Sequence, residues 1–253
     1  MKRFLVIVLL AVAAGPGADI ALASEAGDTS PVVLITGANR GLGLELARQY
    51  GEAGWHVIGT ARKPDAAADL KETGARIVQL DVTDADSVAS MATELDGQPI
   101  DLLINNAGVL DRNGAFPEVD IDTVEWILDV NVLGPMRVTQ ALLPNLSAGD
   151  RKTIVGISSG LGSLAQNESG GLYGYRESKV ALNMFTRSLA NELRDDGFIV
   201  VAMNPGWVQT DMGGENAALT PEQSISGVRS VIDSLTTEDT GTFRIHNGGT
   251  NPW

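Results

Sequence analysis

Short runs of apolar and β-branched residues alternate along the chain with longer segments of helical periodicity. The strand-like runs are residues 32–36, 56–60, 76–80, 102–105, 153–158, 198–204 and 242–245. The helical segments are residues 41–53, 65–73, 84–95, 120–145, 173–195 and 221–235. This alternation is typical of a parallel sheet with crossover helices. It predicts one α/β domain over residues 31–253, a doubly wound sheet of seven parallel strands with helices on both faces.

The first 30 residues do not follow this alternation. Met1-Lys2-Arg3 precedes an apolar stretch from Phe4 to Ala14, and Ala21-Leu22-Ala23 offers the small residues that a signal peptidase recognises. We expect a secretory signal peptide over residues 1–23 and a flexible spacer over 24–30. A cleaved leader implies a periplasmic or secreted protein. A leader retained as an anchor implies a membrane tether, and a misassigned start implies a cytoplasmic protein.

Composition narrows the classes of function. The chain has 32 acidic and 18 basic residues, a net charge of −14, which disfavours nucleic acid as a partner. The absence of cysteine excludes disulfide scaffolds, thiol catalysis and zinc-thiolate sites. Only two histidines, His56 and His246, are present, so we expect no metal site. A small-molecule ligand is the expected partner.

A glycine-rich turn, Thr36-Gly-Ala-Asn-Arg-Gly-Leu-Gly43, joins the first predicted strand to the first predicted helix. Glycines here let the main chain approach a pyrophosphate, and the helix that follows supplies free N–H groups and a favourable dipole. We therefore expect a Rossmann-type dinucleotide site. Its contacts in this turn would be Gly37, Asn39, Arg40, Gly41, Leu42 and Gly43.

The end of the second predicted strand bears on which dinucleotide binds. In dinucleotide folds an acidic residue at this position binds the ribose diol and selects NAD. Here Ala61 takes that position and Arg62 follows it. NADP(H) is therefore expected over NAD(H), because Arg62 and Arg40 could hold the additional 2′-phosphate. The alternative is that Arg62 is only a solvated loop cation.

Tyr175 and Lys179 lie four residues apart on a predicted helix, so both side chains project from one face. A tyrosine with its usual pKa near 10 is a poor proton shuttle at neutral pH. A nearby ammonium stabilises the phenolate, so we expect Lys179 to lower the pKa of Tyr175. Such a pair alone is common on helix surfaces. Tyr173 is a weaker candidate because Glu177, not a lysine, lies four residues beyond it.

Taken in order, these motifs resemble the short-chain dehydrogenase/reductase family. The glycine turn has that family's Thr-Gly-x-x-x-Gly-x-Gly form. The segment from Asn204 to Asp211 and the ending Phe243…Asn251-Pro252-Trp253 are similar to the C-factor and sniffer-like carbonyl reductases. The resemblance covers residues 32–253. It implies hydride transfer from NADPH to an aldehyde or ketone with Tyr175 as proton donor, and a homodimer formed through helices 120–145 and 173–195.

The resemblance also implies roles for polar residues around Tyr175. Ser159 would hold the substrate carbonyl, with Ser158 as the alternative. Asn131 would hold a water that links Lys179 to solvent, and a helix kink before Gly134-Pro135 is compatible with that role. The segment between Ser159 and Tyr175 is longer than in many family members, so an insertion around residues 167–171 is expected.

Further cofactor contacts are implied at the ends of three strands. Asp81 would accept a hydrogen bond from the adenine amino group and Val82 would pack on the ring, although Asp81 could equally cap the following helix. The remaining contacts would be Asn105, Ala107, Gly108, Pro205, Gly206, Val208 and Thr210. The segment from Asp211 to Pro221 is short and rich in glycine and alanine, which favours an open pocket for carbonyl compounds of modest size.

Two features of the sequence match other functions. Gly156-Ile-Ser158-Ser-Gly160 matches the Gly-x-Ser-x-Gly elbow of serine hydrolases, with His246 downstream, but no His-Gly-Gly-Gly oxyanion segment is present. The likeness to the C-factor group leaves open a signalling or sensor protein that binds NADP with little turnover.

Overall fold

The computed structural model describes residues 29–112 and 116–253. Within them, seven parallel strands form one sheet in the order β3-β2-β1-β4-β5-β6-β7. The strands are β1 (Val32–Ile35), β2 (His56–Ala61), β3 (Arg76–Gln79), β4 (Leu102–Asn105), β5 (Thr153–Ile157), β6 (Ile199–Asn204) and β7 (Phe243–Ile245). Each lies within one residue of its predicted bounds, so the predicted doubly wound fold is confirmed.

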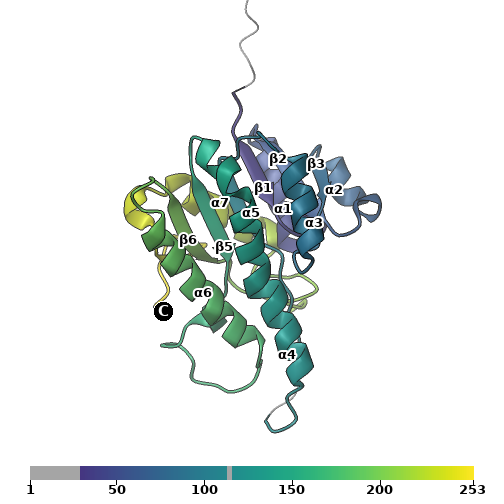
Figure 1. Ribbon diagram of the computed structural model, residues 1–253. Coiled ribbons are helices and arrows are strands. Elements are labelled where there is room, and N and C mark those ends of the chain that lie inside the picture. Colours follow the sequence, from purple (N-terminus) through teal and green to yellow (C-terminus); the bar gives the residue numbers. More distant parts are fainter. Residues whose placement is uncertain (1–28, 113–115) are drawn as a thin grey trace, which may run out of the picture.

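Helices cover both faces of this sheet (Figure 1). The α-helices are α1 (Gly41–Glu52), α2 (Ala68–Glu72), α3 (Ala85–Glu94), α4 (Ile121–Leu128), α5 (Gly134–Ala148), α6 (Tyr175–Glu192) and α7 (Pro221–Ser234). Short 3-10 turns are η1 (Pro64–Ala66), η3 (Gly160–Gly162) and η4 (Thr237–Asp239). The core formed with α3, α5 and α6 includes Leu34, and the core formed with α1, α2 and α7 includes Ile35. Successive strand residues therefore serve opposite faces, which explains why the strands are apolar throughout.

The helix predicted over residues 120–145 is divided in the structure, and the interruption lies where a kink before Gly134-Pro135 was expected. Helices α4 and α5 are joined by a π-helical segment, η2 (Asp129–Leu133), and α5 continues to Ala148. Pro135 lacks an N–H group and its ring would crowd the carbonyl one turn earlier in a regular α-helix. The wider π turn accommodates the proline without ending the helix.

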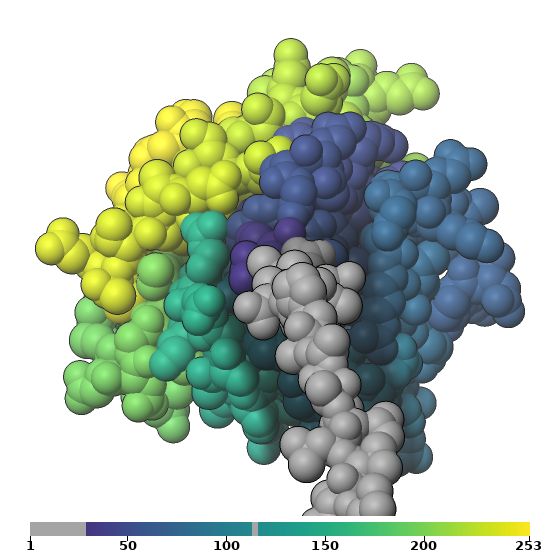
Figure 2. Space-filling view, turned by 90° about the horizontal axis from the view of Figure 1, so that it is seen from above, coloured from purple at the N-terminus to yellow at the C-terminus, as the bar shows by residue number. Residues whose placement is uncertain are grey.

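All strands run in one direction, so their carboxyl ends meet at one edge of the sheet, the lower edge in Figure 1. Figure 2 views the molecule from the other end, where the chain enters β1. The predicted leader, residues 1–23, and most of the predicted spacer lie outside the described residues. Along the part of the chain that is described, no helix has the length and apolar character to cross a membrane.

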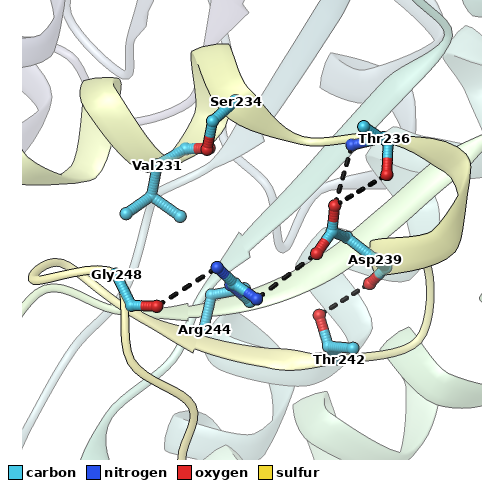
Figure 3. A network of polar contacts seen from close by, with 7 residues as sticks. All are labelled: Val231, Ser234, Thr236, Asp239, Thr242, Arg244 and Gly248. Atoms are coloured by element: carbon cyan, nitrogen blue, oxygen red, sulfur yellow. Dashed lines mark hydrogen bonds and ion pairs between the residues drawn. The ribbon is translucent and has the colours of Figure 1, made fainter.

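Strand β7 forms the edge of the sheet and is held by side chains as well as by its pairing with β6 (Figure 3). The guanidinium of Arg244 donates to Asp239 Oδ1 at 3.3 Å and to the Gly248 carbonyl at 3.2 Å. The other carboxylate oxygen of Asp239 accepts from the Thr236 amide at 2.8 Å. These contacts fix β7 to the turn before it and to the loop after it.

Asp101 secures the opposite, amino-end edge of the sheet. Its buried carboxylate accepts from the amide of Val32 at 2.8 Å, and from the amides of Asp150 at 2.8 Å and Arg151 at 3.3 Å. One side chain thus joins the starts of β1 and β4 to the turn before β5. Charge-assisted hydrogen bonds of this kind are costly to lose when the donors stay buried.

Asp101→Ala is expected to lower the free energy of unfolding by about 2–4 kcal/mol, because three main-chain donors lose their acceptor. Asp101→Asn should cost less, since it keeps one acceptor oxygen. Urea unfolding at neutral pH measures both. Asp96→Ala, at an exposed position nearby, is the matched control. Equal effects at positions 96 and 101 would contradict the proposed role of Asp101.

Candidate active site

The glycine turn after β1 has a conformation that only glycines accommodate. Gly37 and Gly41 have φ angles of +64° and +54°. A Cβ on Gly43 would meet the Gly37 carbonyl oxygen and would lie 2.6 Å from Asn106 Nδ2. The turn therefore has no space for a side chain at Gly37 and Gly43, which suits close approach of the main chain to a phosphate.

Two residues outside the predicted site hold this turn in place. The buried Thr36 hydroxyl accepts from the amides of Asn106 and Ala107, both at 2.9 Å. The Asn106 side chain donates to the Thr36 carbonyl at 2.8 Å and to the Gly37 carbonyl at 3.1 Å. Thr36 lies within the quoted glycine turn, and Asn106 lies between the predicted contacts Asn105 and Ala107, but the contact between Thr36 and Asn106 has no local sequence signal.

The start of α1 fits an anionic group. Arg40 is the N-cap and makes no capping hydrogen bond with its side chain, and the first turn contains no acidic residue. The positive end of the helix dipole is thus left for a ligand. The Arg40 guanidinium reaches Asp211 Oδ2 at 3.0 Å, and both side chains are exposed. Arg62 and Asn39 are exposed as well, while Leu42 packs partly against the core beneath.

Asp81 caps a tight turn at the end of β3 and does not cap α3. Its Oδ1 accepts from the amide and the hydroxyl of Thr83 at 3.0 and 2.7 Å, whereas the N-cap of α3 is Asp84. Burial acts to raise the pKa of Asp81, but the Thr83 hydrogen bonds and the charge of Arg62 outweigh it and leave the pKa below its usual value. Val82 is buried and packs against Gly134.

The segment after β4 joins the turn to the reacting centre. Asn105 Nδ2 donates to Thr139 at 3.1 Å, and its buried Oδ1 has no hydrogen-bond partner. Ala107 faces Gly37. A Cβ built on Gly108 would lie 3.3 Å from Asn131 Oδ1 and 3.7 Å from Lys179 Nζ. Small residues at 107 and 108 therefore keep this segment close to both neighbours.

Tyr175 and Lys179 lie on the buried face of α6, next to Ser159. Tyr175 is the first residue of the helix, and its ring centroid is 5.5 Å from Lys179 Nζ. The Lys179 ammonium donates to the Ile157 carbonyl oxygen at 2.9 Å. Burial lowers the pKa of Lys179 to about 8.

The expectation that Lys179 lowers the pKa of Tyr175 is wrong for this structure. Burial raises the pKa of this phenol, and a side-chain hydrogen bond with Ser159 opposes that effect only in part. Desolvation disfavours the phenolate strongly at this depth. The proton of Tyr175 is consequently retained at neutral pH.

The structure separates the two candidate serines. The Ser158 hydroxyl is buried and donates to Asn183 Oδ1 at 2.6 Å. Ser159 is partly exposed and shares a hydrogen bond with Tyr175. His246 lies against Gly206 and Gly227, and the hydrogen-bond partner of the Ser158 hydroxyl is Asn183, not a histidine. The hydrolase elbow therefore lacks its expected base, and Ser159 is the serine that meets the tyrosine.

Asn131 lies in the π-helical segment with its side chain fully engaged. It exchanges two hydrogen bonds with the Val109 main chain, at 2.8 and 2.9 Å, and donates to Ser178 Oγ at 3.0 Å. Ser178 in turn donates to the Tyr175 carbonyl at 2.7 Å. The π turn and the site residue coincide, so Asn131 ties α6 to the segment after β4.

The segment after β6 folds over the glycine turn. Gly206 has a φ of +84°, and the Pro205 carbonyl accepts from Ser224 Oγ at 2.7 Å. Val208 is buried. The Thr210 methyl would lie 3.6 Å from a Cβ built on Gly41, which places this segment directly against the turn.

Exposed apolar side chains surround this edge of the sheet. Phe116, Leu164, Trp207 and Met212, here called the apolar rim, follow the ends of β4, β5 and β6 and are 74, 70, 57 and 38% exposed. Tyr173 contacts Phe116, with ring centroids 5.7 Å apart. The longer segment before Tyr175 forms a loop that Arg176 bridges through Ser169 and Gly171. Figure 1 shows this loop below α6.

The comparisons with known proteins agree with this geometry. Residues 31–219 match the family described as short chain dehydrogenase. C-signal of Myxococcus xanthus is 45% identical over 164 residues, 65% of this chain and 99% of that protein. The 1-hydroxy-2-glutathionyl-2-methyl-3-butene dehydrogenase of Rhodococcus sp. (strain AD45) is 37% identical over 227 residues, 86% of this chain and 97% of that enzyme.

Solved structures show the same fold. Carbonyl reductase Sniffer of D. melanogaster has a TM-score of 0.83 at 30% identity and covers 88% of this chain and 100% of its own. The NADPH-bound carbonyl reductase from chicken fatty liver has a TM-score of 0.82 at 32% identity, with 88 and 99% coverage. The resemblance predicted from the motifs is confirmed: the chain belongs to the short-chain dehydrogenase family of oxidoreductases.

Proposed function

We propose that the protein is an NADPH-dependent carbonyl reductase that acts on aldehydes or ketones. The observation that carries the proposal is the meeting of Ser159, Tyr175 and Lys179 beside the glycine turn. Two of the similar structures are carbonyl reductases, and one of them has NADPH bound. Both facts support reduction of a carbonyl group at this edge of the sheet.

Each residue has a distinct role in the proposed reaction. NADPH, when bound, supplies the hydride. Tyr175 donates a proton to the substrate oxygen, and its burial keeps that proton in place at neutral pH. Ser159 holds the same oxygen through its hydroxyl. Lys179 would pass the replacement proton to Tyr175, and a water held at Asn131 would link Lys179 to solvent.

The preference for NADP(H) over NAD(H) rests on the end of β2. Ala61 is buried where an acidic residue would select NAD, and Arg62 beside it is exposed and available to an anion. The cofactor would be held by the glycine turn, by Asp81 and Val82, by the segments after β4 and β6, and by Tyr175 and Lys179. Similar structures that hold NADP or NADPH support this choice.

The substrate is proposed to be an apolar aldehyde or ketone of modest size. The apolar rim offers aromatic and aliphatic contacts around an open edge. We also propose a homodimer formed through α4, α5 and α6. Trp126, Leu133 and Met136 on the α4–α5 helix and Met184 on α6 are exposed and apolar, as such an interface requires.

Lys179 illustrates the cost of this arrangement. Its folded-state pKa of about 8 lies below its ordinary value of 10.5, so the unfolded chain binds more protons between these two pH values. The full destabilising effect of burying the ammonium therefore applies below pH 8. This effect decreases as the pH rises and is lost above 10.5. A buried ammonium that destabilises the fold in this way is a candidate functional residue.

Tyr175→Phe is expected to lower kcat by on the order of 10²–10⁴ while leaving NADPH affinity nearly unchanged, because only the proton donor is lost. The assay follows NADPH oxidation with a panel of aldehydes, ketones and quinones. Tyr173→Phe is the matched control and should retain turnover. NADPH binding without turnover in either parent or variant would instead favour a sensor or signalling protein, as the likeness to C-signal allows.

Arg62→Asp is expected to weaken NADPH binding by on the order of 30-fold or more relative to NADH, since a cation facing the 2′-phosphate becomes an anion. Dissociation constants from fluorescence titration of both cofactors measure the change. Lys71→Asp, an exposed charge reversal on α2, controls for net charge. An unchanged ratio of the two constants would sink the NADP assignment.

Lys179→Met is expected to abolish turnover and to raise the free energy of unfolding at pH 7 by about 1–3 kcal/mol. The gain is less than the full pKa shift implies because the Ile157 carbonyl loses its donor. Urea unfolding at pH 7 and pH 10 tests this, with the difference from the parent shrinking at the higher pH. Lys71→Met should show no such pH-dependent difference. A variant less stable than the parent at pH 7 would refute the argument.

A further inference from the structure

Asn251 lies buried near the carboxyl edge of the sheet and uses both ends of its amide. Its Oδ1 accepts from Asn204 Nδ2 at 3.0 Å, and its Nδ2 donates to Gln166 Oε1 at 2.8 Å. Its main-chain amide donates to the Phe243 carbonyl at 2.8 Å. The side chain therefore bridges two segments that are 38 residues apart in the sequence, at positions 166 and 204.

The two bridged segments are the ones that flank the reacting centre. Asn204 ends β6, and its Oδ1 accepts from the Gly206 amide at 2.9 Å, which fixes the Pro205-Gly206 turn. Gln166 lies in the loop that follows Ser159. A Cβ built on Gly160 would lie 3.2 Å from Asn204 Nδ2 and 3.8 Å from Asn251 Nδ2, so the residue after Ser159 packs on this bridge.

Trp253 holds Asn251 in place. Its ring stacks on Phe243 with centroids 5.4 Å apart, and the Arg187 guanidinium carbon lies 5.5 Å from the ring centroid. The main-chain oxygen of Trp253 accepts from the Ala165 amide at 3.1 Å and from Ser163 Oγ at 3.4 Å. Figure 1 shows this part of the chain beside α6. The network in Figure 3 fixes Arg244, the residue after Phe243, and Phe243 itself pairs with Ala202 of β6.

We propose that Asn251 is a positioning residue for the reductase reaction, because its side chain fixes the separation between the Ser159 loop and the Pro205-Gly206 turn. The proposal rests on the proposed function, in which Ser159 holds the substrate and the turn contacts the cofactor. Hydride transfer requires reacting atoms about 3–3.5 Å apart, and a displacement of about 1 Å can cost on the order of 100-fold in rate. A side chain that links the two segments acts on this distance without touching either reactant.

The chemistry of an amide suits this role. One end accepts from Asn204 while the other donates to Gln166, so the two bonds differ in direction. Leucine has a similar volume and can form neither bond. Gln166 is exposed, so its replacement tests the link without opening a buried cavity. Gln166→Ala removes the acceptor, whereas Gln166→Glu retains an acceptor oxygen for Asn251.

The experiment compares Asn251→Leu, Gln166→Ala and Gln166→Glu with the parent, and Asn167→Ala serves as an exposed control. Steady-state kinetics with NADPH, and with NADPH deuterated at the transferred position, give kcat and its isotope effect. Asn251→Leu is expected to lower kcat by on the order of 10-fold or more, to leave NADPH affinity within about 2-fold and to increase the isotope effect. Gln166→Ala should lower kcat by a smaller factor, and Gln166→Glu should keep kcat near that of the parent.

Two outcomes overturn the positioning role. One is an unchanged kcat in Asn251→Leu. The other is a loss that matches the loss of folded protein with an unchanged isotope effect, since partial unfolding removes active enzyme without slowing hydride transfer. Urea unfolding of each variant supplies the folded fraction.

Hydrogen exchange separates failure of this proposal from failure of the proposed function. If the parent reduces no carbonyl compound, the function fails while the link is still testable. Exchange in residues 160–166 and 204–208 should then accelerate together in Asn251→Leu. Acceleration confined to residues 160–166, or absent from both segments, would show that Asn251 does not couple them.

Discussion

The close packing of the turn after β1 against the segment after β4 is the constraint on which the site depends. There is no room for a side chain at position 43, because Gly37 and Asn106 lie against it. The Thr36 hydroxyl accepts hydrogen bonds from two main-chain amides of the segment after β4. Strands β1 and β4 are neighbours at the point where the strand order reverses. Open α/β sheets bind their ligands at this point. The same contact fixes the start of α1 and the course of residues 107 and 108, which pass beside Lys179.

The reacting centre is then assembled by buried polar contacts rather than by ion pairs. The π-helical segment turns Asn131 inward, where it reaches both Val109 and Ser178. Because each buried amide or hydroxyl here has a defined partner, the geometry is stiff where the chemistry needs it. The exception is Asn105 Oδ1, a buried acceptor without a partner, at the end of the strand nearest the turn.

The strands and the main site residues could be predicted from the sequence, because local patterns and family motifs encode them. Strand bounds were accurate because strands covered on both faces are apolar throughout. The residues that the motifs singled out, Tyr175, Lys179 and the glycine turn, lie at one edge of the sheet. The break in the long helix was expected as a kink before Gly134-Pro135, but its π-helical form was not, because apolar periodicity continues through residues 129–133. The Tyr175 pKa was predicted in the wrong direction because burial depends on tertiary packing. The contacts of Thr36 with Asn106, and of Asn251 with Asn204 and Gln166, join distant positions and leave no local signal.

The ion pair between Arg40 and Asp211 shows how the segment after β6 can lie against the glycine turn and still admit a cofactor. It joins the glycine turn to the segment that covers it, yet both partners are largely exposed. Exposed pairs contribute about 0–1 kcal/mol, and a phosphate can offer the guanidinium two charge-assisted hydrogen bonds in place of the one to Asp211. Arg40 can therefore exchange Asp211 for a phosphate at little cost. The contacts that must stay fixed are buried, and the contact that must open is exposed.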